Sequence, residues 1–509
     1  MKNINLFLIT AVLTFTTIYS QNIKSPSEFL GYELGTQFSR HNQVVDYFKH
    51  VSSEFPSKVV LEKYGESNER RPLYITYISS ENNIKNLEKI RNNNLNNAGM
   101  DGIKDDNYDS TAIVWLSYNV HGNESSSTEA AMKTLYMLVT ENSDWLENTL
   151  VILDPCINPD GRDRYANWYN QNVTYPLNTD LDAREHNEPW PGGRANHYLF
   201  DLNRDWAWLT QKESRDRIKI YNKWLPHIHV DFHEQGIDEP YYFAPAAEPL
   251  HEQITDWQRE FQIEIGDNHA KYFDKNGWLY FTKETFDLLY PSYGDTYPTF
   301  LGAIGMTYEQ AGGGDAGLGV LNQENEVVSL IDRINHHTTT GLSTVEISSI
   351  NAIRLNSEFK EFFKSNNNSK ISYVLKGNKD KIKSLTNLLD QHEIIYGYSE
   401  SKNQVKGYNY SANKEIKIDI DKNDLIVSAN QPKGKLVEIL FEQKTKLSDP
   451  LTYDITAWSL PYAYGLEASV IDVKVETVSK TSNFKLNEIN SNSIGYIFEW
   501  SSLKDAEFL

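Results

Sequence analysis

His121 and Glu124 are three residues apart and directly follow an apolar segment, 112–120, that predicts a buried strand. A His and a Glu at a strand-to-helix turn can both point at one metal ion, and Gly122 between them lets the backbone turn sharply. The C-terminal edge of a sheet is also where α/β proteins place their sites. A polar surface turn is the alternative, because so short a motif arises often by chance.

A second strand pattern puts His229, Asp231 and His233 on one face. His233 ends this strand, so it can reach the same sheet edge as His121. Two His and one carboxylate leave the fourth position of a zinc ion open for water, which is the catalytic arrangement. His227 and His229 are alternative ligands, although packing or solvent contact suits them better.

Arg194, Asn203 and Arg204 suit a substrate carboxylate, since guanidinium groups bind carboxylates through two parallel hydrogen bonds. Taken singly, the two arginines are more often surface charges. Asp201 can instead hold a metal-bound His in its correct tautomer. Glu309 ends an apolar strand pattern, where a carboxylate is costly unless it is paired or used. It can act as general base toward a metal-bound water, or simply lie in solvent.

Alternating strand and helix patterns must position these side chains. They predict an α/β domain, residues 25–347, with a mixed, mostly parallel sheet flanked by helices. The expected strands are 112–120, 150–157, 228–232 and 303–308, and the expected helices are 127–142, 212–224 and 325–341.

A polar linker, 365–369, precedes a second expected α/β domain at residues 370–509. Its expected elements are strands 371–375 and 393–398 and helix 379–392. The last strand pattern, 494–498, is followed by only a short tail, so we expect this domain to be incomplete.

Composition restricts the function classes. The 509 residues carry a formal net charge of -21, which argues against nucleic acid or an anionic membrane as partner. The single cysteine, Cys156, follows an apolar run and predicts a buried residue, so neither an internal disulfide nor a thiolate metal cluster can form. Residues 1–20 combine Lys2, an apolar run and the small Ser20, which is typical of a cleaved secretory signal peptide. We therefore expect an exported protein, periplasmic or extracellular, without a membrane-spanning helix.

Together these motifs resemble the zinc metallocarboxypeptidase family of the carboxypeptidase A/B and N/E types. The resemblance extends from about residue 40 to about residue 345, and several short motifs in one order are more specific than any single motif. The matching stretches are His121-Gly122-Asn123-Glu124, Asn158-Pro159-Asp160-Gly161, Gly193-Arg194, Asp201-Leu202-Asn203-Arg204, His233 and Glu309.

The resemblance implies that one Zn²⁺ ion is held by His121, Glu124 and His233. It also implies that Glu309 activates the attacking water and later protonates the leaving amine. Arg194 would stabilise the oxyanion together with zinc.

For the substrate, the resemblance implies that Asn203 and Arg204 bind the terminal carboxylate of a peptide. Asp201 would be the partner of the first His ligand. A mobile Tyr of the family corresponds to Tyr290, with Tyr293 as the alternative.

The resemblance thus implies a zinc carboxypeptidase that removes C-terminal residues from peptides with a free C-terminus. A zinc amidohydrolase acting on acyl-amino acids or cell-wall peptides, and an inactive peptide-binding relative, are the alternatives. Asp295 lies near the expected specificity pocket, where it either favours Lys or Arg at the substrate's end or caps a turn. The second domain resembles a glutamine-amidotransferase-like module. It contains no cysteine, so we expect a structural or binding role.

Overall fold

The computed structural model describes residues 23–365, 369–454, 457–478, 492–495, 497 and 500–508. The expected signal peptide, residues 1–20, lies outside this range, as does part of the predicted strand 494–498. Ile494 and Gly495, which are described, are not in a strand. No helix in the described residues combines the length and apolar character that crossing a membrane requires.

An eight-stranded sheet forms the centre of the larger unit, with strand order β1-β2-β4-β3-β5-β10-β6-β8. The central strands β4, β3, β5 and β10 run parallel, whereas β1 and β2 join them through antiparallel pairs. This confirms the predicted mixed, mostly parallel sheet. The strand bounds are Val59–Glu66 (β1), Pro72–Ile78 (β2), Ala112–Tyr118 (β3), Thr149–Asp154 (β4), Ile228–Gln235 (β5), Tyr241–Tyr242 (β6), Tyr280–Phe281 (β8) and Ile304–Ala311 (β10).

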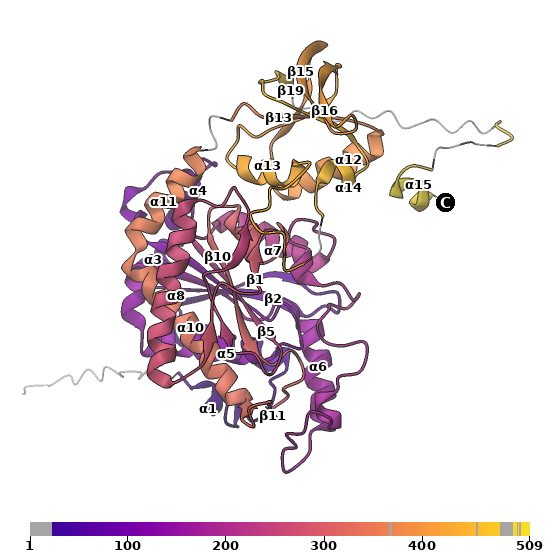
Figure 1. Cartoon of the computed structure of the whole chain (residues 1–509). Helices are drawn as coiled ribbons and strands as arrows, with labels where there is room; N and C mark the ends of the chain where they lie inside the picture. Colours follow the sequence, from indigo (N-terminus) through magenta and orange to yellow (C-terminus); the bar gives the residue numbers. More distant parts are fainter. Residues whose placement is uncertain are drawn as a thin grey trace, which may run out of the picture.

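Helices cover both faces of this sheet (Figure 1). Alternate residues of β3 belong to two cores: Val114 and Leu116 pack with α2, α5, α8 and α10, whereas Ile113 and Trp115 pack with α4, α7 and α11. Strands buried on both faces read as continuous apolar runs, which is why the sequence marks them clearly. The helix bounds are Pro26–Leu30 (α1), His41–Glu54 (α2), Glu81–Lys85 (α3), Leu87–Asn97 (α4), Ser126–Thr140 (α5), Pro159–Asn172 (α6), Lys212–Trp224 (α7), Asp256–Asn276 (α8), Thr296–Thr299 (α9), Leu330–Ile350 (α10) and Ala352–Lys364 (α11).

Helix α10 begins later than the pattern 325–341 predicts. The Ser329 side chain accepts a hydrogen bond from the Asp332 backbone N–H and caps the helix there. The residues before it form a short antiparallel pair, Gly319–Leu321 (β11) with Val327–Ser329 (β12). Helix α7, in contrast, has the predicted bounds.

A second unit contains a seven-stranded sheet in the order β16-β15-β18-β13-β17-β14-β19, and every pairing in it is antiparallel. The predicted strands 371–375 and 393–398 and helix 379–392 correspond to β13, β14 and α12. The bounds are Ser372–Lys376 (β13), Tyr396–Ser399 (β14), Asn403–Asn409 (β15), Lys414–Ile420 (β16), Leu425–Ser428 (β17), Glu467–Ile471 (β18), Thr477–Val478 (β19), Lys379–Gln391 (α12), Gly434–Phe441 (α13), Leu460–Ala463 (α14) and Leu503–Phe508 (α15); the pair Ala247–Leu250 (β7) and Asp287–Leu288 (β9) belongs to the first unit.

The two units share a continuous core. Helices α12 and α13 lie between the second sheet and the larger unit (Figure 1), and their apolar side chains join the same cluster as α7 and α11. Buried polar contacts cross the interface as well. His392 faces the Tyr297 hydroxyl at 2.7 Å and the Ala207 carbonyl at 2.8 Å, and Lys433 donates to Asn222 at 2.9 Å. The second unit is therefore held in one position on the first.

Candidate metal centre

His121, Glu124 and His233 converge at the C-terminal ends of β3 and β5. These strands are parallel neighbours with Tyr118 opposite Phe232, so the turn after β3 lies beside the end of β5. The Glu124 carboxylate lies 2.7 Å from His121 Nδ1 and 3.0 Å from His233 Nδ1. All three side chains are buried, and their ligand atoms lie within 4.8 Å of one another.

The donor set fits a divalent zinc ion. His121 Nε2 faces the Asp201 carboxylate at 2.9 Å, and a proton held there leaves the Nδ1 lone pair directed inward. The two Nδ1 atoms are only 3.2 Å apart, with a carboxylate between them. Burial alone would raise the pKa of Glu124, but the two imidazole rings lower it below its usual value. Two nitrogens and an ionised carboxylate gathered away from water suit a metal cation.

Gly122 is required by close packing. A Cβ at this position would lie 2.2 Å from the Arg162 backbone nitrogen, in helix α6. The backbone of the turn therefore approaches the helix too closely for any side chain. The glycine allows the turn to bring His121 and Glu124 together.

The alternative ligands lie elsewhere. His227 Nδ1 accepts a hydrogen bond from the Ile113 backbone N–H at 2.8 Å. His229 packs against the rings of Trp115 and Trp206. Both histidines are buried, and burial lowers the pKa of each to about 3, so they are neutral packing residues.

Glu309 lies on β10 directly opposite His233 of β5. It is 8% exposed and lines the same cavity as the three candidate ligands. Burial raises the pKa of Glu309 to about 8. A cation bound beside it would counteract this effect and favour the ionised carboxylate, the form that accepts a proton.

Arg194 joins the candidate ligands to Asp201. One terminal nitrogen lies 3.2 Å from Glu124 Oε1 and the other 3.0 Å from Asp201 Oδ2. Burial lowers the pKa of Arg194, but Glu124 and Asp201 raise it above its ordinary value. A permanent positive charge is thus fixed at the edge of the site, where it can bind a developing oxyanion.

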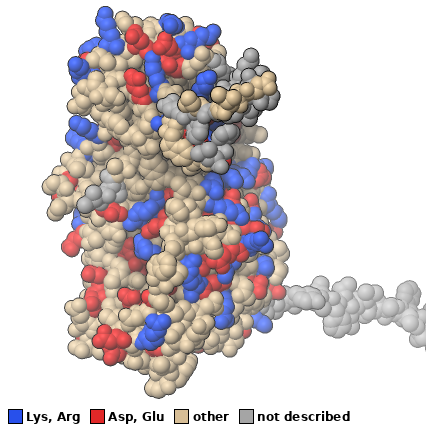
Figure 2. Space-filling model, turned by 90° about the vertical axis from the view of Figure 1, so that its right-hand side faces the viewer, with Lys and Arg blue, Asp and Glu red and all other residues tan. Residues whose placement is uncertain are grey.

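These side chains open into one cavity of about 320 Å³. The cavity includes His121, Glu124, Arg194, Asn203, Arg204, His233, Tyr293, Asp295, Glu309 and Tyr453 among its lining. Basic and acidic side chains are interspersed over the face of the molecule shown in Figure 2.

Residues 44–270 match the family model described as zinc carboxypeptidase. This region, which is less than half of the chain, is similar to zinc carboxypeptidases. Carboxypeptidase 2 of Trichophyton rubrum is 28% identical over 125 residues, which are 24% of this chain and 18% of that protein. The chain thus spans less than a fifth of the curated relatives it matches.

Solved carboxypeptidases are also similar in structure. The metallo-carboxypeptidase of Burkholderia cenocepacia has a TM-score of 0.43 and 13% identity, covering 62% of this chain and 70% of that one. Carboxypeptidase A of Helicoverpa armigera has a TM-score of 0.39 and 17% identity, covering 66% and 75%.

The predicted substrate residues differ in how they lie relative to the cavity. Asn203 is fixed between the Gly294 N–H, 2.7 Å from its Oδ1, and His233 Nε2, 3.2 Å from its Nδ2. Tyr293 lines the cavity, and the Arg204 guanidinium lies 4.5 Å from its ring centre. Tyr290 instead accepts a hydrogen bond from the Trp208 indole at 2.7 Å, and it is not among the residues that line this cavity.

Asp295 lies in the cavity wall and caps a turn at the same time. Its carboxylate accepts hydrogen bonds from the Thr296 backbone N–H at 2.6 Å and the Thr307 hydroxyl at 2.9 Å. Burial raises the pKa of Asp295 to about 6. Asp295 therefore caps a turn and also lines the cavity in which a substrate side chain could lie.

The sequence patterns did not indicate that the second unit supplies residues to the cavity. Tyr453 lines the cavity that contains the three candidate ligands, and the adjacent Asp454 contacts Arg204. No local motif surrounds either residue, so only the docking of the two units reveals them.

We expect Asp201→Asn to weaken zinc binding about ten- to a hundredfold, because the variant loses the charge that holds the outer nitrogen of His121. Competition with a chelator measures the zinc dissociation constant. Asp205→Asn is the matched control, since Asp205 caps Thr210 and Gln211. Unchanged affinity in the Asp201 variant would refute the role of this carboxylate.

Proposed function

We propose that this protein is a zinc-dependent carboxypeptidase that removes residues from the C-terminus of peptides. The observation that carries the proposal is the convergence of His121, Glu124 and His233 in a cavity that also contains Glu309 and Arg194. The family match of residues 44–270 supports the same chemistry.

The chain's own groups have distinct tasks in this proposal. When bound, zinc acts as a Lewis acid and lowers the pKa of water. Glu309 accepts the proton of the attacking water and later delivers it to the leaving amine. Arg194 donates hydrogen bonds to the oxygen on which negative charge develops.

In this proposal, Arg204 makes the enzyme prefer the C-terminal end of a peptide substrate. Its guanidinium lies at the cavity wall and can bind a carboxylate through two nitrogens. We favour Tyr293 over Tyr290 as the residue that covers a substrate, because Tyr293 lines the cavity, and Asn203 lies beside His233. A peptide that lacks a free terminal carboxylate cannot form these two hydrogen bonds with Arg204.

A peptide digest followed by mass spectrometry tests this function. Incubation of the zinc-loaded protein with mixed peptides is expected to give ladders shortened only at the C-terminus, and amidated peptides should resist. Bound zinc without cleavage of any peptide would contradict the proposal and favour an amidohydrolase or an inactive relative.

We also propose that the protein is exported and loses residues 1–20, from the signal-peptide pattern alone. Mass measurement of the N-terminus of protein recovered outside the cytoplasm tests this. The glutamine-amidotransferase-like resemblance of residues 370–509 stays a prediction, and the family match ends before that region.

A further inference from the structure

The Asp454 carboxylate, in the second unit, accepts a hydrogen bond from the guanidinium of Arg204, which is 250 positions away in the sequence. Its Oδ2 lies 3.2 Å from both Nε and Nη2 of Arg204. The Tyr293 hydroxyl donates to the same oxygen at 2.8 Å. A carboxylate of the protein itself therefore fills a contact that the proposed function assigns to the substrate.

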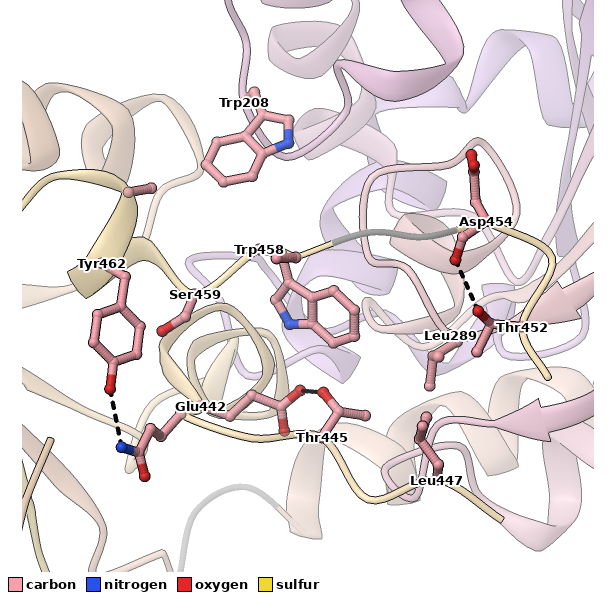
Figure 3. A pocket seen from close by; sticks show the side chains of 13 residues that line it. Trp208, Leu289, Glu442, Thr445, Leu447, Thr452, Asp454, Trp458, Ser459 and Tyr462 are labelled. Atoms are coloured by element: carbon pink, nitrogen blue, oxygen red, sulfur yellow. Dashed lines mark hydrogen bonds between the residues drawn. The ribbon is translucent and has the colours of Figure 1, made fainter. Parts of the chain in front are cut away.

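The two residues that precede Asp454 help to hold it in place. The Tyr453 backbone N–H donates to Asp287 at 2.7 Å, and the Tyr453 ring packs 5.3 Å from that of Phe286. The Thr452 hydroxyl donates to the Asp454 carbonyl at 2.8 Å, as Figure 3 shows. The carboxylate of Asp454 is thus presented to Arg204 by a locally bonded backbone.

Among the described residues, no other acid lies as close to the Arg204 guanidinium as Asp454 does. Asp201 Oδ2 lies 3.9 Å from its Nη1, farther than Asp454. Asp454 Oδ2 lies against the Nε and Nη2 edge of Arg204, and the same edge can bind the two oxygens of a terminal carboxylate. The Asp454 carboxylate and the terminal carboxylate of a substrate would therefore compete for the Nε and Nη2 atoms of Arg204.

Space for displacement lies next to this contact. A cavity of about 630 Å³ between the units is lined by Trp208, Leu289, Thr452, Asp454 and Trp458 among others (Figure 3). Asp454 lies on the border between this cavity and Arg204. Its side chain can turn away from the guanidinium without entering packed protein.

We propose that Asp454 is an internal competitor for the terminal carboxylate of the substrate, so that the second unit restrains the peptidase. The inference rests on the proposed function, because that function assigns the substrate carboxylate to Arg204. A peptide must displace Asp454 before its end is bound. Restraint at this point raises KM for substrates with a free C-terminus and leaves the metal and Glu309 untouched.

Calorimetric titration of the zinc-loaded protein with 3-phenylpropanoate tests the competition directly. We expect Asp454→Asn to lower the dissociation constant at least tenfold and Asp454→Ala to act in the same direction. Asp449→Asn is the matched control, since Asp449 accepts only a hydrogen bond from the Leu451 N–H among the described contacts. The neutral analogue 3-phenylpropanamide should show no difference between the proteins.

A double variant, Asp454→Asn with Arg204→Ala, should lose the affinity gained. This result assigns the gain to the Arg204 edge rather than to the metal. Equal affinity of wild type and Asp454→Asn for the carboxylate, or a gain that persists without Arg204, would overturn the inference. Circular dichroism establishes that each variant is folded.

Peptide hydrolysis provides the second readout. With a free C-terminus we expect KM at least tenfold lower in Asp454→Asn and kcat nearly unchanged. Absence of cleavage by all proteins, together with tighter carboxylate binding by Asp454→Asn, would reject the proposed function and retain the competition. Cleavage with equal KM in both proteins would retain the function and reject the competition.

Discussion

Glu309→Gln is expected to bind zinc as the wild type does and to hydrolyse peptides at least a hundredfold more slowly. Glu309 is on β10, across from His233, and contributes no ligand atom to the converging group. The amide keeps the size of the side chain but cannot accept the proton of the attacking water. General acid–base groups contribute about 10²- to 10⁴-fold to rates. Metal analysis and steady-state hydrolysis of a chromogenic peptide measure the two quantities.

Glu326→Gln is the control for this experiment. Glu326 is exposed and precedes β12, outside the cavity, so the same chemical change there should leave turnover intact. Undiminished hydrolysis by Glu309→Gln would remove Glu309 from the mechanism. Zinc loss in that variant would instead make it part of the metal site.

Glu124→Ala is expected to lose zinc during dialysis and activity with it. The Glu124 carboxylate lies between His121 and His233 and supplies the only negative charge among the three candidate ligands. Two neutral imidazoles alone would leave the ion with a weak, incomplete set of ligands. Metal content per chain and hydrolysis after dialysis measure the effect.

Thermal or denaturant unfolding gives an independent measure of this loss. A ligand at a hundred times its dissociation constant stabilises the folded state by about 2.7 kcal/mol, so added zinc should stabilise wild type but not Glu124→Ala. Glu141→Ala, an exposed position just after α5, is the matched control. Full zinc content in the Glu124 variant would show that other groups hold the ion.

The metal group could be predicted from the sequence because its parts are local. His121 and Glu124 share one turn, and His233 ends a strand whose alternation is visible in the letters. Burial on both faces makes β3 almost wholly apolar, so its position could be predicted as well. The adjacency of β3 and β5, which brings His233 to the other two, follows from the expected parallel sheet.

Other features could not be predicted because they depend on contacts distant in the sequence. Nothing near Asp454 indicates that it meets Arg204, since that contact arises only when the second unit docks. The hydrogen bond between Trp208 and Tyr290 could not be predicted either, because these residues are 82 positions apart in the sequence. The role of Gly122 also needed α6 in place, because the obstacle to a side chain there is the backbone of that helix.

The continuous apolar cluster that joins α7 and α11 to α12 and α13 has a consequence for the metal site. The two units share one hydrophobic core, so their separation would expose apolar side chains to water at a high free-energy cost. That cost determines how stably Tyr453 and Asp454 stay beside the cavity that contains the candidate ligands. We therefore expect substitutions around His392 or Lys433, at the interface of the units, to change the affinity of the cavity for the terminal carboxylate of a peptide.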